Sequence, residues 1–106
     1  MARALVNVPK TAKPGEVIEV RAMIAHPMET GYRVGPNGTN IPRDIIRRFA
    51  CTYDGEEVFS ADLFPAVSAN PFIAFTLVAT TSGTVAFTWT DDGGETQTAS
   101  AEITVS

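Results

Sequence analysis

The chain has 106 residues, of which 44% are hydrophobic and 19% are charged, and its mean hydropathy is close to zero. This length suits a single domain with its own core, so residues 1–106 are expected to form one globular unit. No apolar run approaches the roughly 18 residues that a membrane-spanning helix needs. The net charge of −4 argues against a nucleic-acid backbone as the main ligand.

The charges are unevenly distributed along the chain. All eight Lys and Arg residues lie at or before Arg48, where only four acidic residues oppose them. The first 48 residues therefore carry a net charge of +4 and the remainder carries −8. Either the two halves interleave in space and this charge averages out, or the molecule is dipolar and its two faces attract different partners.

The first half of the chain predicts two strands and then a long loop. Residues 3–8 form a short strand, and Pro14-Gly15 suits the centre of a type II turn. Residues 17–25 alternate between apolar and polar side chains, which is typical of a half-buried strand. Pro27 has no N–H to give to a sheet, so this strand stops there. Residues 27–44 contain three Gly and three Pro without apolar periodicity, and an irregular connection of this length is usually either functional or disordered.

The second half predicts five further strands, at residues 49–53, 57–64, 72–79, 84–90 and 95–105. Asp54-Gly55 is a strong hairpin signal, and the sequence 91–94 is another turn. Residues 41–48 fit either one helical turn or the start of a strand, and residues 72–79 are apolar enough to be buried on both faces. The prediction is an all-β fold, an immunoglobulin-like or fibronectin-III-like antiparallel sandwich of about seven strands. Its core is expected to centre on Trp89, Phe87, Phe75 and Ile24.

The inventory of reactive residues excludes several kinds of site. One Cys and one His allow neither an intramolecular disulfide nor a metal site that takes several His or Cys ligands. His26 lacks a recognisable nucleophile and orienting group, so it is interpreted as a loop-anchoring or interface residue. Cys51 is interpreted as a buried small hydrophobe, with an intermolecular disulfide as the alternative. The sequence therefore predicts no catalytic residue, no metal ligand and no cofactor.

Four stretches of the chain, taken together, resemble the SoxZ family of the bacterial sulfur-oxidation (Sox) pathway. They are residues 24–31, 41–51, 65–71 and 87–94, which read IAHPMETG, IPRDIIRRFAC, PAVSANP and FTWTDDGG. The resemblance implies an immunoglobulin-like, non-catalytic subunit that forms a heterodimer with the Y subunit of the sulfur-carrier complex. In that family the Y subunit carries sulfur intermediates on a cysteine in its C-terminal arm. The last residues here, 101–106, contain neither Gly nor Cys.

The resemblance also implies a role in presenting the Y subunit to periplasmic Sox enzymes, after export alongside a signal-bearing partner. We expect the loop from His26 to Arg43 to face the partner, because of its length and its Gly and Pro content. The expected partner-binding residues are His26, Met28, Glu29, Thr30, Gly31, Arg33 and Arg43.

Two other functions fit a small sandwich. An iron-dependent superoxide reductase would need several His ligands, and this chain has one. A generic adhesive or extracellular immunoglobulin-like binding module is the other alternative, and such modules are expected within longer multidomain chains.

Overall fold

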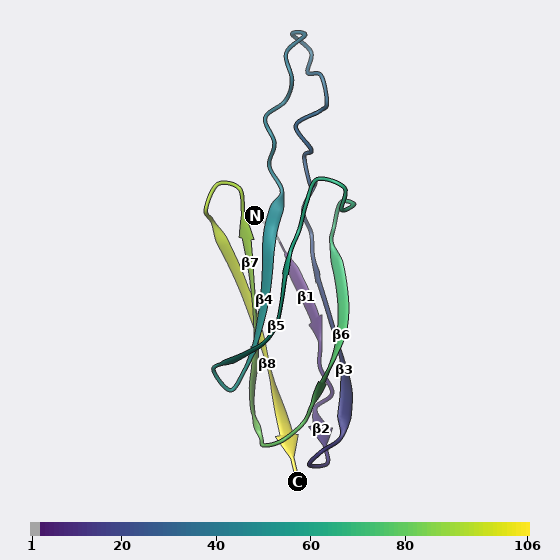
Figure 1. Ribbon diagram of the computed structural model, residues 1–106, viewed down its shortest axis with the longest axis vertical. Coiled ribbons are helices and arrows are strands. Elements are labelled where there is room, and N and C mark those ends of the chain that lie inside the picture. Colours follow the sequence, from purple (N-terminus) through teal and green to yellow (C-terminus); the bar gives the residue numbers. More distant parts are fainter. Residues whose placement is uncertain (1–2) are drawn as a thin grey trace.

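Eight strands make up the computed structural model, which describes residues 3–106, and they pack as two sheets face to face (Figure 1). One sheet has three strands in the order β1-β3-β6, and the other has five in the order β2-β8-β7-β4-β5. The strands are β1 (Ala4–Asn7), β2 (Thr11–Ala12), β3 (Val17–Ile24), β4 (Ile46–Tyr53), β5 (Glu56–Asp62), β6 (Phe72–Val78), β7 (Gly83–Asp91) and β8 (Thr96–Val105). The predicted all-β sandwich is confirmed, and the described residues contain no helix that could span a membrane.

The strands and turns that were predicted from alternating side chains or from a turn-forming residue pair are present in the structure. Asp54 and Gly55 both have positive φ, 55° and 86°, which is the backbone of the tight hairpin that their sequence predicts. The short strand β2 is not predicted by the sequence, since only two residues form it, in parallel with β8.

Of the two alternatives for residues 41–48, the start of a strand is the correct one, because β4 begins at Ile46 and residues 41–45 form no helical turn. Two expectations are wrong. β6 is not buried on both faces, because Phe72 and Val78 are 59% and 50% exposed. Phe75 is half-buried at the edge of the core rather than at its centre, since β6 is the outermost strand of its sheet.

The core is organised around the aromatic ring of Phe49 on β4. Its centroid lies 5.4 Å from that of Trp89, 6.2 Å from Phe87 and 6.1 Å from both Phe59 and Phe75. These rings come from both sheets, so Phe49 joins the two layers where an immunoglobulin domain would have a disulfide. Offset and tilted aromatic pairs at these separations add to the hydrophobic gain of burial.

The two halves of the chain interleave in space, and part of their opposite charge is paired. Arg48 of β4 forms ion pairs with Glu57 and Asp62 of β5, and Arg43 pairs with Asp92 after β7. Basic residues of the first half thus lie beside acidic residues of the second.

We predict that Phe49→Ala lowers the free energy of unfolding by about 3–5 kcal/mol, because it leaves a cavity among four other aromatic rings. Phe72→Ala is the matched control, since Phe72 is mostly exposed and its loss is expected to cost less than about 1 kcal/mol in the isolated protein. Equilibrium urea unfolding of both variants measures the difference. Equal losses would contradict a core centred on Phe49.

Candidate functional site

Residues 27–45 form a projecting hairpin that stands beyond one end of the sandwich (Figure 1). Its arms are paired at two antiparallel bridges, Glu29 with Asp44 and Val34 with Asn40. The Glu29 and Asp44 backbones exchange two hydrogen bonds of 2.9 and 2.8 Å, and the Gly35 N–H donates to the Thr39 carbonyl at 2.7 Å. The expected irregular loop is therefore a hairpin with its own backbone hydrogen bonds, and it lengthens the molecule to 59 Å.

The base of the hairpin is anchored by two buried residues, His26 and Met28. The Met28 N–H donates to His26 Nδ1 at 2.9 Å, and the Met28 sulfur accepts a hydrogen bond from the Ile46 N–H at 3.3 Å. On the other side, His26 and Asn70 exchange two hydrogen bonds, from the His26 N–H to Asn70 Oδ1 and from the Asn70 N–H to the His26 carbonyl. His26 and Met28 are only 8% and 4% exposed, so they hold the hairpin from beneath.

Met28 adopts a left-handed backbone conformation, with φ of 54°. This costs a residue with a side chain about 1–2 kcal/mol. The burial of its side chain and the two hydrogen bonds described above offset that cost, so the turn at the base of the hairpin is held in one conformation.

The next residues bring the two arms close together. Gly31 has φ of 89°, and a Cβ at this position would lie 3.0 Å from the Cβ of Arg43 on the opposite arm, so only glycine fits. Arg33 donates hydrogen bonds to the Glu29 carboxylate, and these hydrogen bonds lower the pKa of Glu29 below its ordinary value. Thr30 and Arg33 are on the accessible part of this arm, together with Tyr32, which is 79% exposed.

Arg43 ties the second arm to the sandwich. Its guanidinium donates two hydrogen bonds of 2.8 Å, one to each carboxylate oxygen of Asp92, which lies in the turn between β7 and β8. Asp92 Oδ2 also accepts from the Ile45 N–H at 3.2 Å, and the Asp92 N–H donates to the Ile45 carbonyl at 3.0 Å. The hydrogen bonds from Arg43, with that from Ile45, hold the pKa of Asp92 below its ordinary value.

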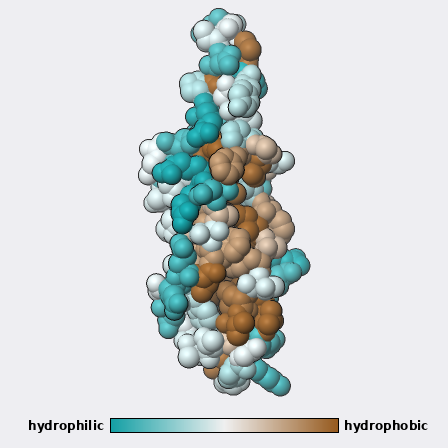
Figure 2. All heavy atoms as spheres, in the orientation of Figure 1, coloured by the Kyte–Doolittle hydropathy of each residue, from teal (hydrophilic) through white to brown (hydrophobic). Residues whose placement is uncertain are grey.

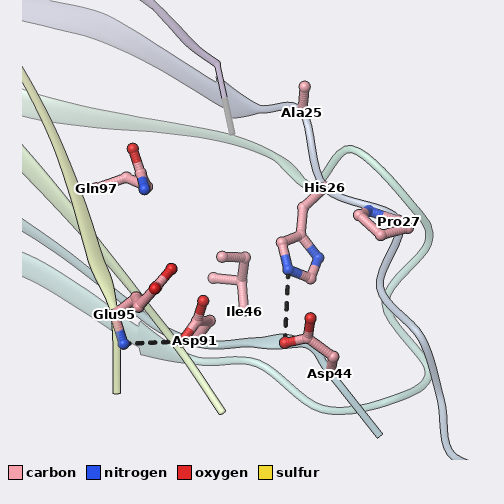
Figure 3. A pocket seen from close by; sticks show the side chains of 8 residues that line it. All are labelled: Ala25, His26, Pro27, Asp44, Ile46, Asp91, Glu95 and Gln97. Carbon is pink, nitrogen blue, oxygen red and sulfur yellow. Dashed lines mark hydrogen bonds and ion pairs between the residues drawn. The ribbon is translucent and has the colours of Figure 1, made fainter. Parts of the chain in front are cut away.

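A hollow of about 270 Å³ lies where the hairpin meets the β7–β8 turn (Figure 3). His26, Asp44, Asp91 and Glu95 point toward it, and His26 Nε2 lies 3.9 Å from Asp44 Oδ1. The ligand atoms of His26, Asp44 and Asp91 lie within 4.8 Å of one another, as in a metal site. However, Nδ1 of His26 accepts a backbone hydrogen bond, so the neutral ring carries its proton on Nε2. A metal ligand needs that nitrogen unprotonated, and the geometry therefore does not suit a metal.

Cys51 lies on β4 between Phe59 of β5 and Phe87 of β7, and its side chain is fully buried. The interpretation as a buried small hydrophobe is confirmed, and an intermolecular disulfide would require the sandwich to open. Burial raises the pKa of the Cys51 thiol to about 11.

The structure thus places the seven expected partner-binding residues in the projecting hairpin or at its base, in two environments. Glu29, Thr30, Gly31, Arg33 and Arg43 lie on its arms, whereas His26 and Met28 are beneath them. Sequence reasoning missed the anchoring roles of Asn70 and Asp92. In the sequence, Asn70 and Asp92 are recognisable only as members of turns. No local pattern connects Asn70 with His26, which lies 44 positions earlier, or Asp92 with Arg43, which lies 49 positions earlier.

Comparison with known families matches residues 6–102 to the family described as sulphur oxidation protein SoxZ. The chain belongs to the SoxZ family. No curated protein matches the sequence. The SoxZ fold seen here is shared with the sulfur carrier protein SoxY from Chlorobium limicola f. thiosulfatophilum, with a TM-score of 0.68 and 15% identity over 97% of this chain and 78% of that one.

Superoxide reductases share the same sandwich. The neelaredoxin from Ignicoccus hospitalis matches with a TM-score of 0.76 and 20% identity, over 97% of this chain and 80% of that one. A putative superoxide reductase from Thermotoga maritima matches with a TM-score of 0.74 and 18% identity, over 97% and 85% of the two chains. At these identities the likeness shows a common fold alone.

The lowered pKa of Asp92 predicts an acid-dependent stability. A group with a depressed folded-state pKa stabilises the protein above its unfolded value, near 3.9 for Asp, and this contribution is lost as the pH falls through the folded-state value. We expect Asp92→Asn to be less stable than the wild type at pH 7, with the difference shrinking below about pH 4. Urea unfolding across this range measures it. Asp62→Asn, at an exposed ion pair, is the control, and an Asp92→Asn difference that stays constant with pH would contradict the assignment.

Proposed function

We propose that this chain is the non-catalytic subunit of a SoxY–SoxZ sulfur-carrier complex, which binds the SoxY subunit and presents it to the Sox enzymes. The family match over residues 6–102 supports a role in sulfur oxidation. The observation that supports a passive part for this chain is the position of its single thiol. Cys51 is enclosed by the core, which favours a reactive sulfur atom on the other chain.

The thiol chemistry supports this division of labour. A carrier cysteine must reach its substrates as a thiolate, because the thiolate is the nucleophile. With a pKa of about 11, only about one Cys51 thiol in 10⁴ is ionised at pH 7, and that one is surrounded by protein. The buried, protonated thiol of this chain thus supports the proposal that SoxY carries the sulfur intermediates.

The projecting hairpin is proposed as a surface for partner proteins. Its arms carry the expected contact residues Glu29, Thr30, Gly31, Arg33 and Arg43, and Tyr32 and Val34 near its tip are 79% and 60% exposed. Because Arg43, Asp92 and the buried base hold it in one conformation, binding would require little further ordering.

The proposed compartment is the periplasm, reached together with a signal-bearing SoxY. A buried thiol suits this setting, since Cys51 cannot be cross-linked to another chain while the sandwich is folded.

Mixing the purified chain with the SoxY protein of the same organism is expected to give a stable one-to-one complex in sedimentation velocity. The same complex, but not SoxY alone, is expected to sustain thiosulfate oxidation by reconstituted Sox enzymes. Two independently sedimenting monomers would contradict the proposal.

The hairpin is tested in the same assay with Tyr32→Ser/Val34→Ser, which removes two exposed apolar side chains and no core contact. We expect unchanged unfolding and at least a fivefold loss of affinity for SoxY or of oxidation rate. Val17→Ser, an exposed apolar residue at the far end of the sandwich, is the control. Equal behaviour of the two variants would argue against the hairpin as a contact surface.

A further inference from the structure

The edge strand β6 is less protected than the other sheet edges, because Pro71 just before it is the one protective feature that it has. Soluble proteins guard exposed edges with charges, prolines, bulges or short strands. β5 carries Glu56, Glu57 and Asp62, and β1 has four residues and is followed by Pro9. β2 has two residues and pairs with β8 only at Thr104 and Val105, and the rest of that edge of β8 carries Glu102 and several polar side chains. β6 has seven residues, reads FIAFTLV, carries no charge and pairs with β3 without a bulge.

The register of β6 shows which backbone groups face outward. The Ile24 N–H donates to the Pro71 carbonyl, and the Ala79 N–H donates to the Glu16 carbonyl, so hydrogen-bonded pairs stand just beyond both ends of β6. Because such pairs alternate in an antiparallel ladder, Ile73, Phe75 and Leu77 pair with β3. Phe72, Ala74, Thr76 and Val78 therefore direct their N–H and C=O groups to the open edge. Within residues 3–106 no other strand pairs with this side of β6.

The side chains at this edge are apolar. Phe75 of β6 stacks on Phe59 of β5 with centroids 4.4 Å apart, yet both rings are only half-buried because the two sheets do not close over them. Figure 2 shows apolar side chains gathered along this side of the sandwich, over β6 and toward β5. Phe72 and Val78 on β6 and Val58 and Phe64 on or after β5 are 42–64% exposed.

The exposed apolar area is of the size that a stable interface uses. Each exposed Phe offers roughly 100 Å², and the valines with the half-buried Phe59 and Phe75 bring the total to several hundred Å². A standard interface buries about 800 Å² on each partner, a little over half of it apolar.

We propose that β6 is the site at which the SoxY subunit adds a strand, extending the three-stranded sheet to four and covering Phe59 and Phe75. This inference rests on the proposed function and names the surface that would carry it. The SoxY segment that fits this edge is an extended strand. It has no charged residue where it lies beside β6, and the side chains on its inward face are apolar. Main-chain hydrogen bonds to the Phe72, Ala74, Thr76 and Val78 backbones supply the affinity.

Thr76→Pro tests this pairing directly. Proline removes an outward N–H of β6 but no hydrogen bond of the β3–β6 ladder, so the fold is expected to persist. The matched control is Thr98→Pro on β8. Thr98 is also exposed. The Asp91 N–H donates to the Glu95 carbonyl, and from this pair the alternation of the β7–β8 ladder can be counted. It follows that the Thr98 N–H also points away from β7.

Binding to the SoxY protein of the same organism is measured by isothermal titration calorimetry, with circular dichroism as the check on folding. We expect Thr76→Pro to weaken binding at least tenfold and Thr98→Pro to change it less than twofold. Thr76→Glu keeps the N–H but places a charge at the edge, and it provides a second test if the proline variant does not fold. Amide hydrogen exchange of the wild-type complex should slow at Ala74 and Thr76.

The outcomes separate the two proposals. If wild-type protein does not bind SoxY, the proposed function is wrong and this inference is overturned with it. If wild type binds but folded Thr76→Pro or Thr76→Glu binds equally well, only the β6 inference is overturned. If the chain alone dimerises and Thr76→Pro abolishes that dimer while SoxY binding is unaffected, β6 pairs with a second copy and the inference is again wrong.

Discussion

The packing of aromatic rings around Phe49 is the interaction on which the rest of this structure depends. With one cysteine in the chain, nothing covalent joins the two sheets, so the rings of Phe49, Phe87, Trp89, Phe59 and Phe75 must do so. The same packing encloses Cys51, which lies two residues after Phe49 on β4, and this burial removes its thiol from water and raises its pKa. A stable core and an inert cysteine are thus one physical arrangement.

The core also explains where the molecule can bind partners. Three strands face five, so the aromatic cluster is covered well at its centre and incompletely beside β6. At the end of the sandwich, the hairpin extends beyond the core altogether and is held by a buried base and by the contact of Arg43 with Asp92. Both surfaces are held by backbone hydrogen bonds, which fits the proposed role of a subunit that binds a partner.

The sequence predicts those features that depend on a few consecutive residues. Alternation gave β3, β7 and β8, and Asp54-Gly55 gave the β4–β5 turn, because a strand face and a tight turn are encoded within a few residues. It could not identify β6 as an edge strand, since a run that is apolar on both faces reads as a central strand, and only the sheet order decides. The contacts of Asn70 with His26 and of Asp92 with Arg43 join distant segments, so no local pattern could reveal them. The sequence predicts an irregular loop in place of the hairpin. The two arms pair through their backbones at isolated bridges, and such pairing needs no alternation of apolar side chains that the sequence could show.

The central claim is that this chain holds a partner whose cysteine does the chemistry. It is tested most directly by intact mass spectrometry of both subunits after the complex has been incubated with thiosulfate and the loading enzyme. The account predicts a sulfur adduct on the SoxY chain and an unmodified mass for this chain, with Cys51 free. An adduct on Cys51 would contradict it.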